Sequence, residues 1–131
     1  MSKTNLQDFF EAAGKWSCLA QCYIFAAMRL NNLVPTPKAI FETLYDAWVS
    51  EEGIDKEFFV NNPYKLCNIR VIKKDYETLP DDHVYRAVRF DYNGKSHFVL
   101  YFGNQLVYNS LGESQCFLKG KPTTIREIRG E

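Results

Sequence analysis

The chain has 131 residues, and its 16 basic and 16 acidic side chains leave no net charge at pH 7. With 46% hydrophobic and 15% aromatic residues it has enough apolar material for one core, so we expect a single folded domain over residues 1–131. The charge balance argues against nucleic acid and against an anionic membrane surface as partners.

The N-terminal segment and the cysteines favour a cytoplasmic protein. The segment MSKTNLQDFFEAAGK has acidic residues where a signal peptide requires an uninterrupted apolar run. No later window approaches the length of an apolar membrane span. Without a secretory signal, the four cysteines are expected to be free thiols rather than disulfides: Cys18, Cys22, Cys67 and Cys116.

The stretch GKWSCLAQCYIFAAMRL predicts a buried central helix. From residue 18 to about residue 31, apolar side chains recur at helical spacing and also fill the other faces, which is typical of a helix covered nearly all round. Ser17 is a favourable N-cap, because its hydroxyl can accept a hydrogen bond from a first-turn amide. Cys18 then becomes the first helical residue.

Capping residues predict two further helices. In VPTPKAI, Thr36 can cap a helix that has Pro37 at its first position, and we expect this helix to end near Gly53. In VNNPYKLCN, Asn62 can cap a shorter helical turn that begins at Pro63.

After residue 68 the pattern changes to alternating strands. IRVI predicts a short strand, and HVYRAVRFDYNGKSHFVLYF predicts two strands joined by a tight type I′ turn at Asn93-Gly94. Gly103-Asn104 turns the chain into QLVYNS, and TTIREIR contains a last strand. No linker separates the two halves, so they should share one core. The expected fold is therefore α+β, with the N-terminal central helix packed on an antiparallel β-sheet meander.

Three side chains form a candidate catalytic site: Cys18, His97 and Asn109. His97 begins a hydrophobic strand just after an exposed turn, where a general base would have a fixed backbone and an accessible edge. Asn109 ends the next strand, where its amide could hold the imidazole in one tautomer. Cys, His and Asn in this order are the parts of a thiol hydrolase.

The first turn of a helix suits a nucleophilic thiol. A free thiol has a pKa of about 8.5, and a helix N-terminus with an adjacent imidazolium lowers that value. We therefore expect a lowered pKa for Cys18, and a smaller effect on Cys22 one turn further in. The unpaired first-turn amides would also donate to the oxyanion formed when the thiolate attacks a carbonyl.

The register of the last hairpin decides whether His97 and Asn109 can meet. A plain two-residue turn at Gly103-Asn104 would pair Phe98 with Asn109 and put His97 on the opposite face. A three-residue turn that includes Gln105, or a bulge, pairs Val99 with Asn109 and makes His97 its diagonal neighbour. We predict the second arrangement.

At these residues the chain resembles the papain-like cysteine peptidase superfamily, whose members place Cys at the start of a central helix and His and Asn or Asp on a following sheet. Its bacteriocin-leader peptidases carry a second Cys four residues after the nucleophile, which is the spacing of Cys18 and Cys22. Papain has Cys-Trp-Ala-Phe-Ser, which is similar to Cys22-Tyr23-Ile24-Phe25-Ala26 and would select Cys22 instead. We favour Cys18, because choosing Cys22 would turn the good helix formers at 19–21 into a loop.

A closer similarity is to an uncharacterised family of small bacterial and phage-encoded proteins of the same clan. Its aromatic-Gly-Cys, aromatic-Val-Asn-Asp-Pro, Thr-His-Phe-Val and Tyr-Asp-Pro-Leu-Gly-Asp-Ser segments have counterparts here in WSC (16–18), FVNNP (59–63), SHFV (96–99) and YNSLGES (108–114). The leader peptidases place an oxyanion-hole Gln six residues before the nucleophile, where this chain has Ala12, and usually have Asp where it has Asn109. In this sequence, Lys15, Gln7 or the Trp16 region are candidates to replace the oxyanion-hole Gln.

The resemblance and the residues together predict a cysteine peptidase or related thiol hydrolase that cleaves a peptide or isopeptide amide of a peptide or protein substrate through a thioester. Cys18 attacks, His97 shuttles the proton, Asn109 orients the ring, and no cofactor is required. The alternatives are a catalytically inactive papain-like module that binds a protein or peptide, and a structural or regulatory phage protein whose thiols matter only for packing. A zinc site at Cys18, Cys22 and His97 is a further, less favoured interpretation.

Overall fold

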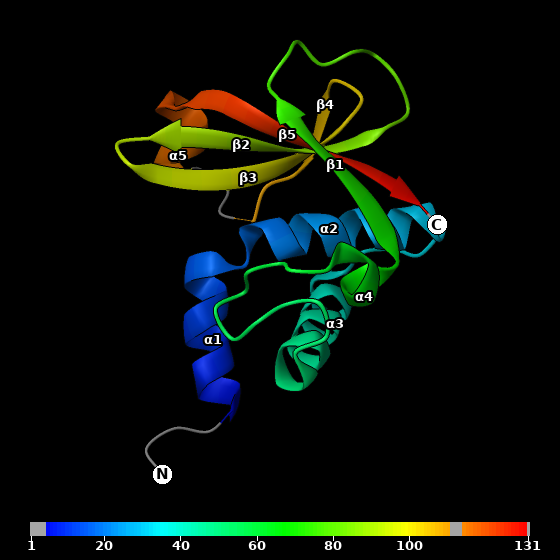
Figure 1. The fold of residues 1–131 in the computed structure, drawn as a ribbon, viewed down its shortest axis with the longest axis vertical. Helices are drawn as coiled ribbons and strands as arrows, with labels where there is room; N and C mark the ends of the chain where they lie inside the picture. Colours follow the sequence, from blue (N-terminus) through cyan, green and yellow to red (C-terminus); the bar gives the residue numbers. More distant parts are fainter. Residues whose placement is uncertain (1–4, 111–113, 131) are drawn as a thin grey trace.

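Five helices and a five-stranded antiparallel sheet make up the part of the chain that the structure describes, residues 5–110 and 114–130 of a computed structural model (Figure 1). The helices are α1 (Asn5–Trp16), α2 (Cys18–Leu30), α3 (Pro37–Ser50), α4 (Pro63–Cys67) and α5 (Gln115–Lys119). The strands are β1 (Ile69–Asp75), β2 (Tyr85–Tyr92), β3 (Lys95–Phe102), β4 (Gln105–Tyr108) and β5 (Lys121–Gly130). None of the helices within these residues is long and apolar enough to cross a bilayer.

The sheet has the order β1-β5-β2-β3-β4, so the expected meander is only partly correct. β2, β3 and β4 follow one another as predicted, but β5 returns between β1 and β2 and pairs with both. Ile125 and Ile128 lie on opposite faces of β5 and are 1% and 2% exposed. A strand that is buried on both faces belongs in the middle of a sheet, which explains why β5 does not occupy an edge.

Local turn and cap chemistry mostly follows the sequence. Asn93 and Gly94 have φ values of 49° and 75°, as a type I′ turn requires, which confirms the predicted hairpin. Thr36 caps α3 by accepting a hydrogen bond from the amide of Ala39. The expected helix end at Gly53 is wrong, because α3 ends at Ser50 and Glu51 takes the left-handed conformation that closes it.

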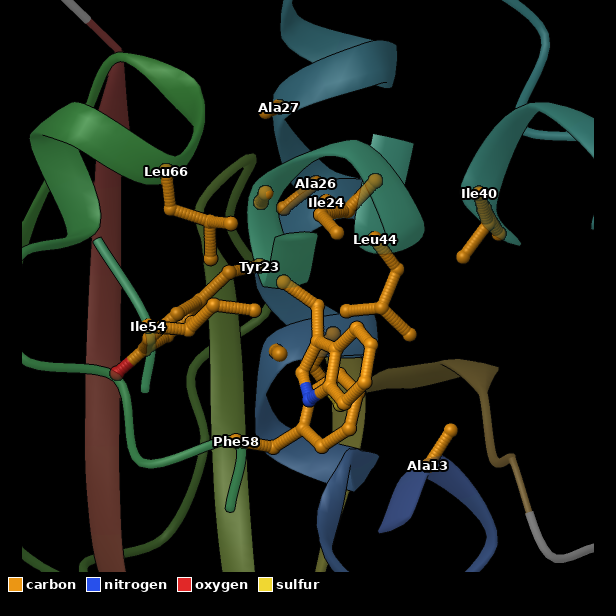
Figure 2. Close-up of a cluster of buried hydrophobic side chains, with 14 of the residues drawn as sticks. Ala13, Tyr23, Ile24, Ala26, Ala27, Ile40, Leu44, Ile54, Phe58 and Leu66 are labelled. Carbon is orange, nitrogen blue, oxygen red and sulfur yellow. The ribbon is translucent and has the colours of Figure 1, made fainter. Parts of the chain in front are cut away.

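The helix α2 is the middle layer of the molecule, with the sheet on one side and α1 and α3 on the other (Figure 1). Its Tyr23 and Ile24 lie among buried side chains from α3 and from the segment after it, including Leu44 and Ile54 (Figure 2). Sheet residues such as Leu100 belong to the same buried cluster, so helices and sheet share a core. The short helix α5, which the sequence pattern did not predict, covers the opposite face of the sheet.

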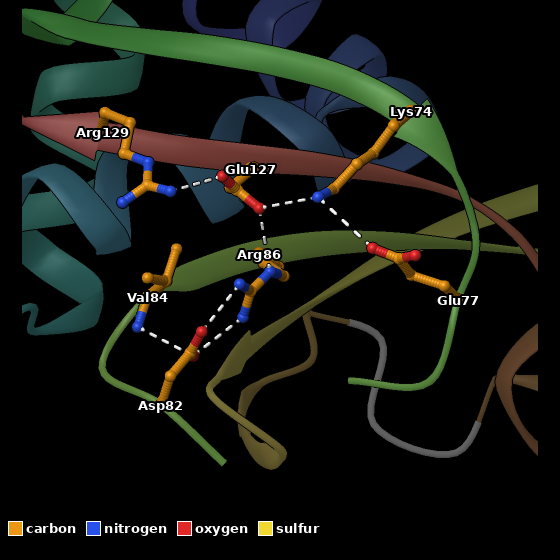
Figure 3. Close-up of polar contacts among 7 residues, drawn as sticks. All are labelled: Lys74, Glu77, Asp82, Val84, Arg86, Glu127 and Arg129. Carbon is orange, nitrogen blue, oxygen red and sulfur yellow. Dashed lines mark hydrogen bonds and ion pairs between the residues drawn. The ribbon is translucent and has the colours of Figure 1, made fainter. Parts of the chain in front are cut away.

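A network of charges ties the connection between β1 and β2 to the sheet (Figure 3). Arg86 and Glu127 are each 6% exposed, and Arg86 Nε donates to a Glu127 carboxylate oxygen at 3.2 Å. The Arg86 guanidinium also binds both carboxylate oxygens of Asp82, which lowers the pKa of Asp82 to about 2. Lys74 and Arg129 contact Glu127 as well. Each buried charge therefore has a partner, which is the condition under which burial is tolerated.

We expect Glu127→Gln to lower the free energy of unfolding by about 3 kcal/mol, because it leaves the buried Arg86 guanidinium without this carboxylate. Burial raises the pKa of Glu127, but hydrogen bonds from Arg129 and Lys74 outweigh it and lower the value. The stabilisation is thus present above the unfolded carboxyl pKa and is lost as pH falls through the lower folded value. Urea unfolding at neutral and acidic pH measures both effects. Glu77→Gln, which removes an exposed partner of Lys74, is the matched control and should change little.

Candidate active site

Cys18 is the first residue of α2, as predicted, but Ser17 does not cap the helix. The Ser17 hydroxyl donates to the carbonyl oxygen of Ala13 at 2.6 Å and accepts from Gln21 Nε2 at 2.7 Å. The reason is the Ser17 backbone, which at φ −91° and ψ 4° is close to helical and directs the side chain over the last turn of α1. The Ser17 side chain therefore occupies none of the first-turn amides of α2.

The Cys18 thiol lies where the start of α2 meets β3. Burial raises its pKa above the ordinary value of 9.0, and the backbone N–H groups of Phe98, Leu19 and Cys18 itself oppose that rise without cancelling it. The expected lowering of the pKa is therefore wrong, because the loss of water around the sulfur outweighs the amides of the helix N-terminus. Phe98 directly follows His97 in β3, so the sulfur lies beside the backbone that carries the candidate base.

Cys22 occupies a different environment one turn further along α2. It is fully buried, its thiol donates to the carbonyl oxygen of Phe98 at 3.8 Å, and burial raises its pKa well above 9.0. A buried thiol with this partner is suited to packing and has no access to a substrate. The geometry favours Cys18 over Cys22 as the reactive cysteine.

His97 is 1% exposed, and its Nε2 lies 2.7 Å from Oδ1 of Asn109. An amide oxygen only accepts hydrogen bonds, so Nε2 carries the proton and the neutral ring has its lone pair on Nδ1. Nδ1 is buried and has no hydrogen-bond partner among the described residues. Burial lowers the pKa of His97 below 6.5 more than the Asn109 hydrogen bond raises it. The imidazole is thus a neutral base with a free lone pair.

A β-bulge brings His97 and Asn109 together. Next to the turn, Phe102 pairs with Gln105, which is the plain two-residue register. The register then shifts, so that Leu100 pairs with Tyr108, and one further residue sets Asn109 opposite Val99. The predicted arrangement is confirmed in its bulge form, and the extra residue returns Asn109 to the face of His97.

Cys18 and His97 line one cavity of about 340 Å³. The cavity opens between the junction of α1 with α2 and the ends of β3 and β4. Its other lining residues are Phe10, Ala13, Gly14, Lys15, Ser17, Gln21, Phe41, Ser96, Tyr108 and Ser110. Cys18 and His97 therefore both line this cavity, and the Asn109 side chain hydrogen bonds to the His97 ring.

Gln21 is a lining residue that sequence reasoning missed. It is 6% exposed, its Oε1 accepts from the Tyr108 hydroxyl at 2.5 Å, and its Nε2 donates to Ser17. The Ala13 carbonyl oxygen, at the end of this series of hydrogen bonds, can only accept. The donors of the series therefore all point toward it, and the Gln21 amide has one orientation. Only one Nε2 hydrogen is used by Ser17. The available signal was a Gln inside a helix whose other faces are nearly all apolar.

The zinc interpretation concerned Cys18, Cys22 and His97. Cys22 lies beneath the Phe98 carbonyl and lines neither of the two cavities that contain Cys18. Within residues 5–110 and 114–130, no group of three or more His, Cys, Asp or Glu side chains is arranged to hold a metal ion.

Comparison of the chain with models of known protein families, with curated proteins and with solved structures finds no match. The resemblance to papain-like peptidases therefore stays a prediction based on the short motifs and on the order of the three residues.

We expect Cys18 to react first when the folded protein is treated with iodoacetamide near neutral pH. Cys22 and Cys116 are buried, and the pKa of the partly buried Cys67 is raised to about 12, so each should react more slowly. His97→Ala should slow the labelling of Cys18, because the base that accepts the thiol proton is removed. Peptide-level mass spectrometry measures the rates, with the unfolded protein as control. Equal rates at all four thiols in the folded protein would contradict the assignment.

Proposed function

We propose that this protein is a cysteine hydrolase that cleaves an amide or isopeptide bond of a peptide substrate, with Cys18 as nucleophile, His97 as general base and Asn109 as the residue that positions the base. The observation that supports this most directly is the buried Nδ1 of His97. It is left with a lone pair by the Asn109 hydrogen bond, and His97 lines the same cavity as Cys18. A merely structural histidine with one buried nitrogen unpaired would cost stability without compensation.

The pKa directions favour a neutral thiol and a neutral imidazole in the resting enzyme. The pKa of Cys18 is above 9.0 and that of His97 is below 6.5, so the thiol keeps its proton between these values. His97 Nδ1 accepts that proton as the sulfur forms a bond to the carbonyl carbon, and returns it to the leaving amine when the C–N bond breaks. Water then attacks the thioester with His97 again as base, which releases the acid and restores the thiol.

Two kinds of donor are available for the oxyanion in this proposal. The first-turn amides of α2 are not used by the Ser17 side chain, and the second Nε2 hydrogen of Gln21 has a fixed orientation set by Tyr108 and Ser17. A preorganised donor of this kind stabilises the tetrahedral intermediate without reorganisation during the reaction. Gln21 would then replace the missing glutamine that the resemblance assigns to the position of Ala12.

A second candidate is a catalytically inactive module that binds a peptide in the same cavity. The raised pKa of the Cys18 thiol favours it, because a protonated thiol is a weak nucleophile unless a base removes its proton. The two candidates differ in one requirement: only the hydrolase needs both Cys18 and His97.

The direct test is hydrolysis of an activated p-nitrophenyl ester and of a pooled fluorogenic peptide library. Cys18→Ala should abolish turnover, and His97→Ala should lower kcat/KM by about 100-fold or more. Because the base must be neutral, kcat/KM should rise with pH through a value below 6.5 and stay level until the thiol ionises above 9.0. Cys22→Ala, which removes the buried neighbouring thiol, is the control and should remain active. Peptide binding that survives Cys18→Ala, with no turnover by the unmodified protein, would instead support the binding module.

Gln21→Ala should lower kcat by about 100-fold and leave KM nearly unchanged, because an oxyanion donor acts in the transition state. Labelling of Cys18 by iodoacetamide forms no oxyanion, so its rate should stay close to that of the unmodified protein. Tyr108→Phe removes the hydroxyl that orients the amide but keeps Gln21, and should give a smaller loss. A parallel loss of labelling and turnover in Gln21→Ala would show that the residue only supports the fold.

A further inference from the structure

A second cavity, of about 570 Å³, meets the first at Cys18, Lys15 and Ser96, which line both. Its walls come from the junction of α1 with α2, from the segment 55–60, and from strands β1, β3 and β5 of the sheet. The remaining lining residues are Trp16, Leu19, Asp55, Glu57, Phe58, Phe59, Val60, Lys73, Phe98 and Arg126. A substrate whose scissile carbonyl lies at Cys18 could therefore extend from one cavity into the other.

Two cations from neighbouring strands line this second cavity. Lys73 on β1 and Arg126 on β5 are direct cross-strand partners, an arrangement in which like charges repel. The Arg126 guanidinium lies 5.4 Å from the centre of the Phe98 ring and hydrogen bonds to Tyr23. Its Nε is buried and has no hydrogen-bond partner in the described part of the chain. A buried, unsatisfied N–H on a charged group is costly, and an anion that binds the guanidinium from the cavity would offset part of that cost.

The carboxylates that share the cavity do not neutralise this pair. Asp55 Oδ1 accepts from the backbone N–H groups of Glu57 and Phe59, at 2.8 and 3.0 Å, and so belongs to its own loop. None of the ion pairs found between described side chains joins Asp55 or Glu57 to Lys73 or Arg126. The third cation of the cavity, Lys15, lies over the Trp16 ring.

We propose that Arg126 and Lys73 bind a carboxylate of the substrate, so that the protein prefers peptides with an acidic side chain or a free C-terminus next to the bond attacked by Cys18. This inference rests on the proposed function only in treating the bound peptide as a substrate, because the site can bind an anion without any catalysis. Arg126 supplies the planar donor pair that matches a carboxylate, and Lys73 adds a charge from the next strand. The exposed aromatic rings of Trp16 and Phe59 form the apolar remainder of the cavity.

Bromoacetylated dipeptides test the site by affinity labelling of Cys18, in which the sulfur displaces bromide and forms a thioether. The probes are bromoacetyl-Gly-Glu amide, bromoacetyl-Gly-Gln with a free C-terminus, and the neutral bromoacetyl-Gly-Gln amide. Saturation kinetics by mass spectrometry give the affinity of each probe. We expect at least one charged probe to bind about tenfold more tightly than the neutral one, with the preference weakening as salt is added. Which charged probe is preferred distinguishes a side-chain carboxylate from a chain end.

Variants assign the preference to the proposed residues. Arg126→Gln should remove most of it, Arg126→Lys should retain part, and Lys73→Gln should reduce it about threefold without disturbing the core, because Lys73 is exposed. Lys65→Gln, which removes an exposed charge on α4 outside both cavities, is the matched control and should keep the full preference. The iodoacetamide rate of each variant reports its intrinsic thiol reactivity.

The outcomes separate this inference from the proposed function. Equal affinity for charged and neutral probes, with Cys18 still labelled and turnover intact, would overturn the carboxylate site and leave the hydrolase standing. A clear charge preference that depends on Arg126 or Lys73, without any turnover, would uphold the site and count against the hydrolase. Failure of every reagent to label Cys18 would overturn both, because the thiol would then be closed to a substrate.

Discussion

The contact between the start of α2 and the outer edge of β3 is the constraint on which the rest of the site depends. The short strand β4 pairs with Leu100, Tyr101 and Phe102 of β3, so no strand of the described residues lies beside the backbone at Phe98 on that side. The thiols of Cys18 and Cys22 occupy that position, one near the Phe98 N–H and the other below its carbonyl oxygen. A longer β4 would cover this edge and separate the helix N-terminus from His97.

The short pairing between β3 and β4 also orients the candidate base. The bulge after the Gly103-Asn104 turn shifts the register by one residue and returns Asn109 to the face of the sheet that His97 occupies. The resulting hydrogen bond selects the tautomer with an unprotonated Nδ1, so a local irregularity in a hairpin has a chemical consequence at a ring nitrogen. The edge position of β4 makes such an irregularity inexpensive, because no further strand has to follow it.

Buried ionisable groups in this protein differ in whether they have a charged partner, and this decides whether they are charged or neutral. Around Cys18 and His97 the loss of water is stronger than the available donors, so both groups are held neutral. Elsewhere on the sheet, Arg86 and Glu127 are also buried but have partners, so they stay charged and stabilise the fold (Figure 3). Arg126 is an intermediate case: its guanidinium has an aromatic ring and a hydroxyl beside it but forms no ion pair with a described carboxylate, which is why we assign it a substrate anion.

The sequence by itself determined the features that arise from nearby residues. The buried central helix that begins at Cys18, the Thr36 cap, the Asn93-Gly94 turn and the α+β class follow from periodicity and turn chemistry, because these preferences act within one helical turn or hairpin. Cys18, His97 and Asn109 were chosen from residue type, order in the sequence and resemblance. The prediction that His97 and Asn109 share a face came from the geometry of the hairpin.

Only the tertiary structure decided the features that depend on segments distant in sequence. The insertion of β5 between β1 and β2 reflects burial on both of its faces, and the Ser17 hydroxyl is diverted by the nearly helical junction with α1. The raised pKa of Cys18 and the fixed amide of Gln21 arise from β3 and β4 closing over the start of α2. Desolvation and hydrogen-bond direction depend on which side chains surround a group in space, and a linear pattern of residues does not contain that information.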